Sequence, residues 1–179
     1  MVLLRGVNVG GHRSFRPTVL ARRLRRLDVV SIGAAGTFVV RRPIPVARLR
    51  REFARRLPFA SEIVICRGRE ITALWTSGFF ARQPERPGIV RFVTVLARRP
   101  RVLPPLPLSL PSRGSWMVRI LATRGRLVLG LYRRRMQVIP YLAALDGLFG
   151  APGTSRSWNT IAAITQVLAG TASGPARTR

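Results

Sequence analysis

Lysine is absent from this chain of 179 residues, and cysteine and histidine each occur once, as Cys66 and His12. A single cysteine excludes an intramolecular disulfide and a cysteine metal cluster. The chain also lacks an apolar run of the roughly 18 residues that a membrane-spanning helix requires. Its first residues have neither the basic segment nor the apolar length of a signal peptide. We therefore expect a cytoplasmic protein without a membrane segment.

Acidic residues are scarce as well: 6 stand against 32 basic residues, all of them arginine, and the net charge is +26. A GC-rich genome would favour arginine over lysine. Aspartate and glutamate also have GC-rich codons, so codon usage does not explain their scarcity. The six acids are scattered and have no metal-ligand spacing, so we expect neither a metal nor a cofactor. The charge imbalance predicts attraction to polyanions at low salt.

The apolar pattern predicts an α+β protein. In the first half the expected elements follow one another as strand, helix, strand, strand, helix and strand. Residues 16–27 and 44–57 form the two helices, because their apolar residues recur at spacings of three and four. This order is typical of the ferredoxin-like, or split βαβ, arrangement, in which both helices pack on one face of an antiparallel sheet.

The second half is less regular, with a strand over residues 88–97, a proline-rich connection, a hairpin over 115–132 and two closing helices. We predict two ferredoxin-like halves with antiparallel sheets, the second irregular. Their predicted boundaries are residues 1–80 and 88–170, and residues 171–179 form a flexible tail.

The glycine-rich stretch LLRGVNVGGH, residues 3–12, begins in a predicted strand and continues into a predicted loop. It lacks the lysine of a Walker loop and the spacing of a dinucleotide fingerprint. Two interpretations stay open. The glycines supply the backbone angles of a tight turn, or the backbone amides and nearby cations hold an anion. The candidate ligand residues here are Arg5, Asn8, Gly10, Gly11 and His12.

A second polar motif, TSRSWNT, covers residues 154–160 before a predicted helix. In the structural interpretation Ser157 or Asn159 caps the helix and Trp158 packs on the core. In the ligand interpretation Arg156 and the free amides of the helix start attract an anion. The ligand hypothesis places this motif and the glycine-rich stretch in one cleft that binds a small anion, with Arg156, Trp158 and Asn159 as its residues.

Arginine on the two predicted helices of the first half suggests an alternative function. Like charges on neighbouring helical positions cost roughly 0.2–0.5 kcal/mol each, and a bound polyanion would relieve that cost. The pattern predicts nonspecific nucleic-acid binding, since no motif for sequence-specific recognition accompanies it. The arginines of this hypothesis are Arg22, Arg23, Arg25, Arg26, Arg51 and Arg55.

An enzyme is the third hypothesis and has the least support in the sequence. It would need His12 as its general acid or base, because no other side chain has an ordinary pKa near neutrality. Cys66 alternates with apolar residues in a predicted strand, so we expect it in the core.

Four motifs in order, LLRGVNVGGH, SIGAAGTFVV, EIVICRGREI and TSRSWNTI, resemble the proteins grouped as domain of unknown function 1697. The resemblance covers about Val2 to Leu168. It implies a largely bacterial family whose fold is built from two ferredoxin-like α+β halves and whose activity is not established. The family's motif positions carry over to Arg5, Gly6, Asn8, Gly10, Gly11, Arg156, Trp158, Asn159 and Thr160.

Two departures from the family stand out. The proline-rich stretch replaces the helix that family members have after the strand matching VRFVTVLA. The segment YRRRMQVIP lacks the serine and lysine that many members carry there in a glycine–x–serine–lysine sequence. Any function that depends on that lysine does not carry over to this chain.

Overall fold

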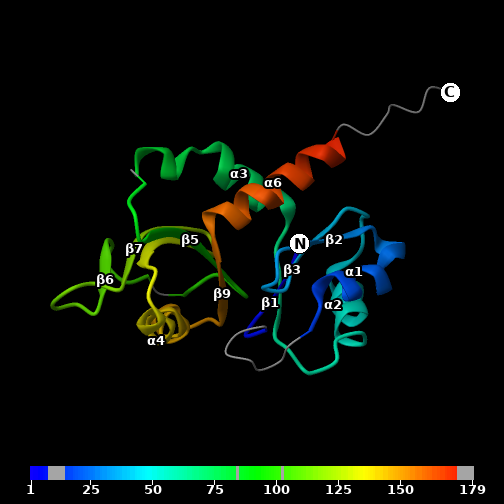
Figure 1. Ribbon diagram of the computed structural model, residues 1–179, viewed down its shortest axis with the longest axis horizontal. Coiled ribbons are helices and arrows are strands. Elements are labelled where there is room, and N and C mark those ends of the chain that lie inside the picture. The colour runs from blue at the N-terminus through cyan, green and yellow to red at the C-terminus, as the bar shows by residue number, and fades with distance from the viewer. Residues whose placement is uncertain (8–14, 84, 102, 173–179) are drawn as a thin grey trace. The chain divides into compact units, whose positions relative to one another are not determined.

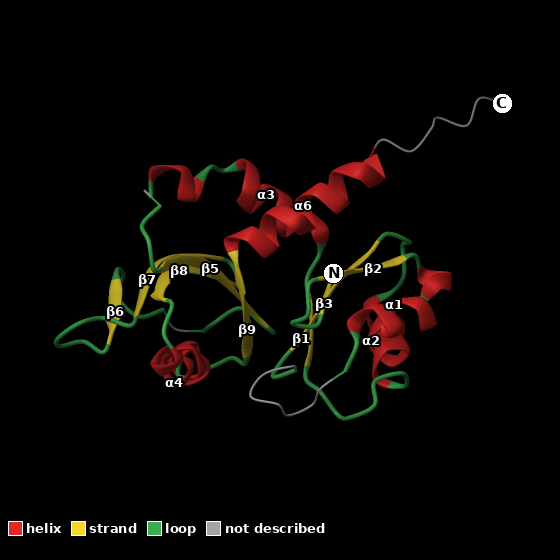
Figure 2. Cartoon of the chain, in the orientation of Figure 1, coloured by secondary structure: helices red, strands yellow, loops and turns green. Residues whose placement is uncertain are grey.

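The computed structural model describes residues 1–7, 15–83, 85–101 and 103–172. It is an α+β protein with two antiparallel sheets of four and five strands. Figures 1 and 2 show its helices and strands. The predicted class is therefore confirmed. The chain forms two compact units: unit 1 comprises Met1–Ser77 and the chain from Thr160 onward, and unit 2 comprises Gly78–Asn159.

Unit 1 holds the four-stranded sheet, in the order β2-β3-β1-β4, with every neighbouring pair antiparallel. Its strands are β1 (Val2–Leu4), β2 (Val29–Ile32), β3 (Thr37–Val40) and β4 (Ile63–Ile65). Helix α1 (Pro17–Arg23) follows β1 and helix α2 (Val46–Ala54) follows β3. The order of elements is the one expected from the sequence. The ferredoxin-like interpretation of this unit stays a prediction.

Helices α1 and α2 pack on the same face of this sheet. Leu20 of α1 and Phe53 of α2 belong to one buried apolar cluster with Val2, Leu4 and Phe38 of the strands. The apolar spacing of each helix thus faces the sheet, and its arginines face solvent.

The first helix is shorter than expected, because α1 ends at Arg23. A separate 3-10 helix, η1 (Arg25–Leu27), follows it. Asp28 then takes a left-handed backbone conformation with φ of 52°, and this conformation ends the helical segment.

Unit 2 holds the five-stranded sheet, in the order β6-β7-β8-β5-β9. Its strands are β5 (Ile89–Leu96), β6 (Leu108–Leu110), β7 (Val118–Arg124), β8 (Leu127–Arg133) and β9 (Gly153–Ser157). Two short helices, α4 (Ile139–Ala143) and α5 (Leu145–Phe149), connect β8 to β9. Phe149 and Leu145 pack with Phe92 and Ile120, so these helices cover one face of the sheet.

This order of elements differs from the split βαβ order predicted for the second half. Four strands come in succession, and a fifth, β9, follows the helices where the sequence predicted no strand but a polar segment leading into the last helix. The proline-rich segment contributes β6, a short edge strand whose three residues are not prolines.

Two more α-helices and two more 3-10 helices, η2 (Phe79–Arg82) and η3 (Met136–Val138), complete the fold of the described residues. Helix α3 (Gly68–Thr76) lies in unit 1, and α6 (Trp158–Ala172) begins in unit 2 and continues in unit 1. A Cβ on Gly68 would lie 3.1 Å from Leu168 Cδ2, so α3 begins in close contact with α6. In the part of the chain that the structure describes, no helix has the length and hydropathy to cross a membrane.

Candidate functional site

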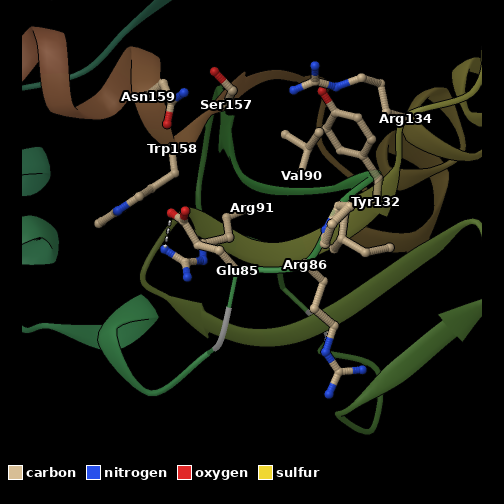
Figure 3. Close-up of a pocket in the computed structure, with 11 residues that line it drawn as sticks. Glu85, Arg86, Val90, Arg91, Tyr132, Arg134, Ser157, Trp158 and Asn159 are labelled. Carbon is tan, nitrogen blue, oxygen red and sulfur yellow. Dashed lines mark hydrogen bonds and ion pairs between the residues drawn. The ribbon is translucent and has the colours of Figure 1, made fainter.

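A pocket of about 600 Å³ lies within unit 2, where β5 begins and where β8 and β9 end (Figure 3). Arg133, the last residue of β8, pairs with Ile89, the first residue of β5. Ser157, the last residue of β9, pairs with Phe92. The start of β5 therefore extends past the end of β9, and the pocket opens beside it. Its lining residues are Glu85, Arg86, Pro87, Ile89, Val90, Arg91, Tyr132, Arg134, Ser157, Trp158 and Asn159.

Tyr132 and Arg134 form one wall of the pocket. Tyr132 pairs with Val90 across the sheet, and its ring packs 5.7 Å from the ring of Phe92. The backbone N–H of Arg134 donates to Gly88 O at 2.8 Å, which fixes the end of this strand. Figure 3 shows the Arg134 guanidinium beside the hydroxyl end of Tyr132. Neither side chain has a hydrogen bond or ion pair with another described residue, so both remain able to bind a ligand.

The electrostatics of this wall favour an anion. Burial raises the pKa of Tyr132 above its ordinary value, and the positive charge of Arg134 acts in the opposite direction. The phenol is therefore neutral at physiological pH and able to donate a hydrogen bond to a ligand. A guanidinium presents planar N–H forks that match phosphate and carboxylate oxygens.

Arg91 has a structural part in the opposite wall. Its guanidinium donates to Glu85 Oε1 at 3.1 Å and to the carbonyl of Gln83, so it holds the segment before β5 against the sheet. Figure 3 shows this ion pair below Trp158. The Nε atom of Arg91 is buried and has no hydrogen-bond partner among the described residues.

The end of β9 and the first turn of α6 complete the pocket through Ser157, Trp158 and Asn159. The Trp158 ring packs 4.8 Å from the Phe80 ring at an angle of 62°, which anchors the helix start. The Asn159 side chain is exposed. The first backbone N–H groups of a helix have no acceptor within it and carry partial positive charge. This end of the helix therefore adds to the positive potential of the pocket.

Cations outnumber carboxylates among the side chains that line the pocket, which favours an anionic ligand. Its described lining includes three arginines and one glutamate, and neither cysteine nor histidine. Arg86 is exposed, and Figure 3 shows it extending away from Tyr132 and Arg134. Arg134 is thus the cation best placed to contact a ligand.

The residues predicted from the second polar motif occupy different environments. Trp158 and Asn159 line the pocket. Arg156 is not among its lining residues: it is only 7% exposed, and its guanidinium donates to Thr154 Oγ1 at 2.6 Å and Ser155 O at 2.8 Å. Burial lowers the pKa of Arg156 to about 10, so it remains charged at neutral pH.

The predicted residues of the glycine-rich stretch are largely outside the described part of the chain. Asn8, Gly10, Gly11 and His12 lie among residues 8–14, which the structure does not describe. Arg5 is described, and its Nη1 donates to Glu62 Oε2 at 3.0 Å. The predicted nucleic-acid contacts are all exposed, on α1, η1 and α2 or just after α2: Arg22, Arg23, Arg25, Arg26, Arg51 and Arg55.

Sequence reasoning missed Tyr132 and Arg134. Their spacing of two at the end of a predicted strand was the available signal, because it points both side chains to the same face of a sheet. The pairing of β8 with β5, which brings them to Trp158 and Asn159, has no local signal in the sequence.

The chain matches no known family model, and no curated protein and no solved structure is significantly similar to it.

Proposed function

We propose that unit 2 binds a small anionic ligand, carrying a phosphate or carboxylate group, in the pocket beside the start of β5. The observation that carries this proposal is the pair formed by the Arg134 guanidinium and the Tyr132 hydroxyl, which have no described partner and lie together in the pocket. The volume of about 600 Å³ falls in the range of small-molecule sites. Charge-assisted hydrogen bonds from arginine are among the strongest that a protein offers an anion.

The resemblance to the domain of unknown function 1697 family supports the same location. Trp158 and Asn159 belong to the motif positions that the resemblance carries over, and both line this pocket. Membership of that family and a cytoplasmic location are parts of the proposal. The predicted participation of the glycine-rich stretch lies outside the described residues, so the proposal rests on unit 2 alone.

Titration with inorganic phosphate and pyrophosphate, followed by calorimetry, tests the proposal. Arg134→Ser is expected to weaken binding by about 10- to 100-fold, the equivalent of one hydrogen bond to a charged group. Arg135→Ser is the matched control, because it removes the same charge from the adjacent exposed residue, which does not line the pocket. Equally weakened binding in both variants would show that the net charge attracts the anion and that the pocket does not bind it.

Nonspecific nucleic-acid binding by unit 1 is the second candidate. Helices α1 and α2 pack on one face of the sheet through a shared core, and the six predicted arginines are exposed. Replacing Arg22, Arg23, Arg25 and Arg26 by serine should weaken duplex binding. The slope of log K against log salt should also become shallower, by about 0.9 for each phosphate that the variant no longer neutralises. Unchanged affinity and slope would exclude this surface.

A further inference from the structure

A second cluster of cations in unit 2 surrounds Trp116. The Cζ atom of Arg119 lies 5.0 Å from the Trp116 ring centre, and that of Arg133 lies 4.9 Å from it. Arg119 of β7 pairs with Leu131 of β8, two residues before Arg133, so both arginines project from the same face of the sheet. All three side chains are partly exposed. None of them lines the pocket described above.

The two guanidiniums are held in fixed orientations. Arg133 Nε donates to Trp116 O at 2.8 Å, and Arg119 Nε donates to Ser109 Oγ at 3.2 Å. Each group thus has one hydrogen bond through Nε and one contact with the indole. The terminal amino groups of both arginines make no hydrogen bond with a described residue, and they are the part of the fork that binds an external phosphate.

No described carboxylate compensates these two charges. Each of the chain's six acids has another partner: Asp28, Glu52, Glu62 and Glu85 pair with other arginines, and Glu70 and Asp146 accept from backbone N–H groups. Because both guanidiniums contact one indole, they are separated by no more than about a Debye length at 0.1 M salt, roughly 10 Å. Their repulsion is therefore not fully screened, and a bound polyanion would relieve it.

We propose that Trp116, Arg119 and Arg133 form a docking site for the phosphate backbone of a single-stranded nucleic acid. Two fixed guanidiniums can contact neighbouring phosphates of one strand. The indole with its two nearby guanidiniums can also contact unpaired bases, which stack on aromatic rings and guanidinium groups, whereas the bases of a duplex are already stacked on one another. The net charge of +26 supplies the long-range attraction that brings a strand to the site.

Fluorescence anisotropy with a labelled 12-nucleotide single strand across a salt series tests this site. The double variant Arg119→Ser/Arg133→Ser is expected to bind about tenfold more weakly or worse, and its salt slope should fall by about 1.4, the value for two neutralised phosphates on a single strand. The matched control is Arg99→Ser/Arg101→Ser, which removes two exposed arginines beyond the opposite end of β5. We expect the control to bind less than threefold more weakly than the wild type.

Two further measurements separate a built site from diffuse attraction and from misfolding. Arg119→Lys/Arg133→Lys keeps the charge and removes the planar fork, so its affinity should still fall about fivefold with an unchanged thermal melt. A duplex of the same length should be affected equally by the test and control double variants. Equal weakening of single-strand binding in Arg119→Ser/Arg133→Ser and in its control Arg99→Ser/Arg101→Ser would overturn the proposal. Wild-type affinity in the lysine variant would overturn it as well.

Discussion

Arginines in the two units have different surroundings. In unit 1 those of α1, η1 and α2 project from helices into solvent, and the apolar side chains beneath them form the core. In unit 2 Arg119, Arg133 and Arg134 lie at or near strand ends beside aromatic rings. Contacts with an indole and hydrogen bonds through Nε hold Arg119 and Arg133 in place, whereas no described arginine of α1, η1 or α2 lies over an aromatic ring.

This difference distinguishes nonspecific electrostatic attraction of anions from binding of anions at a defined site. Exposed arginines on a helix raise the potential around the protein, and salt screens their effect. Guanidiniums fixed by strands and aromatic rings lose less side-chain entropy on binding, and they present their forks at a defined position. We therefore expect the affinity of unit 2 for anions to depend on individual residues and that of unit 1 to depend on total charge.

The largest expected effect comes from Gly130 in the middle of β8. A Cβ there would lie 2.5 Å from Arg119 O and 2.7 Å from Phe92 Cε1. Because a backbone oxygen and a packed ring are in the way, Gly130→Ala should reduce the free energy of unfolding by about 3 kcal/mol, measured by urea denaturation. Since β8 carries Arg133 and leads into Arg134, phosphate and single-strand binding should weaken together.

Gly147→Ala is the control for this variant. Gly147 lies within α5, and a Cβ there has no atom within 4 Å among those described. The same substitution should leave stability unchanged or raise it by about 0.5–1 kcal/mol, through helix propensity. If the Gly130→Ala protein were as stable as the Gly147→Ala protein, β8 would be able to shift and accommodate the added methyl group.

Arg156 extends the comparison within unit 2, because its hydrogen bonds stabilise the folded protein. Arg156→Ala should reduce the free energy of unfolding by about 2 kcal/mol at pH 7, because it removes a buried stem and two hydrogen bonds. The pKa of Arg156 is lowered to about 10 in the folded protein, so above that pH the unfolded chain binds the extra proton. Wild-type stability should therefore rise relative to the variant as pH increases from about 10 towards the ordinary pKa of arginine. A difference independent of pH in this window would contradict the charged, buried state.

The order of elements in unit 1 could be predicted because each helix has an apolar face and each strand is a short, mostly apolar run. Strand β9 could not, because its sequence GTSRS is short and polar. Tertiary contacts stabilise it: Thr94 Oγ1 and Ser155 Oγ lie 2.6 Å apart, and Gly153 leaves room for Thr94. Dependence on tertiary contacts also limited the prediction of the site from the sequence. Trp158 was identified from its motif, whereas the neighbouring wall comes from a strand whose pairing is nonlocal.

Tyr132→Phe tests the anion pocket with a smaller effect. Removing one hydroxyl donor should weaken phosphate binding by about fivefold, the equivalent of about 1 kcal/mol. The raised pKa of Tyr132 keeps the phenol protonated at neutral pH, and a phenolate would repel the anion. Wild-type affinity should therefore fall as pH rises above about 10, the ordinary pKa of tyrosine, and this step should be absent from the variant.

Tyr141→Phe is the control for this measurement, since Tyr141 of α4 does not line the pocket. It should retain both the affinity and the alkaline step. Disappearance of the step in Tyr141→Phe, or its persistence in Tyr132→Phe, would assign the titration to another group.

The smallest expected effect concerns the diffuse charge of unit 1. Glu52 accepts from Arg55 at 2.6 Å and from Arg56 at 2.5 Å, so one carboxylate offsets two arginines at the end of α2. Glu52→Gln should cost about 0.5 kcal/mol in the free energy of unfolding at low salt, and the cost should vanish near roughly 0.5 M salt, because these charges are screened. The control in unit 2 is Glu85→Gln, whose carboxylate is 86% exposed and should contribute less. An effect of Glu52→Gln that persists at high salt would mean that local geometry, and not total charge, organises the arginines of unit 1 as well.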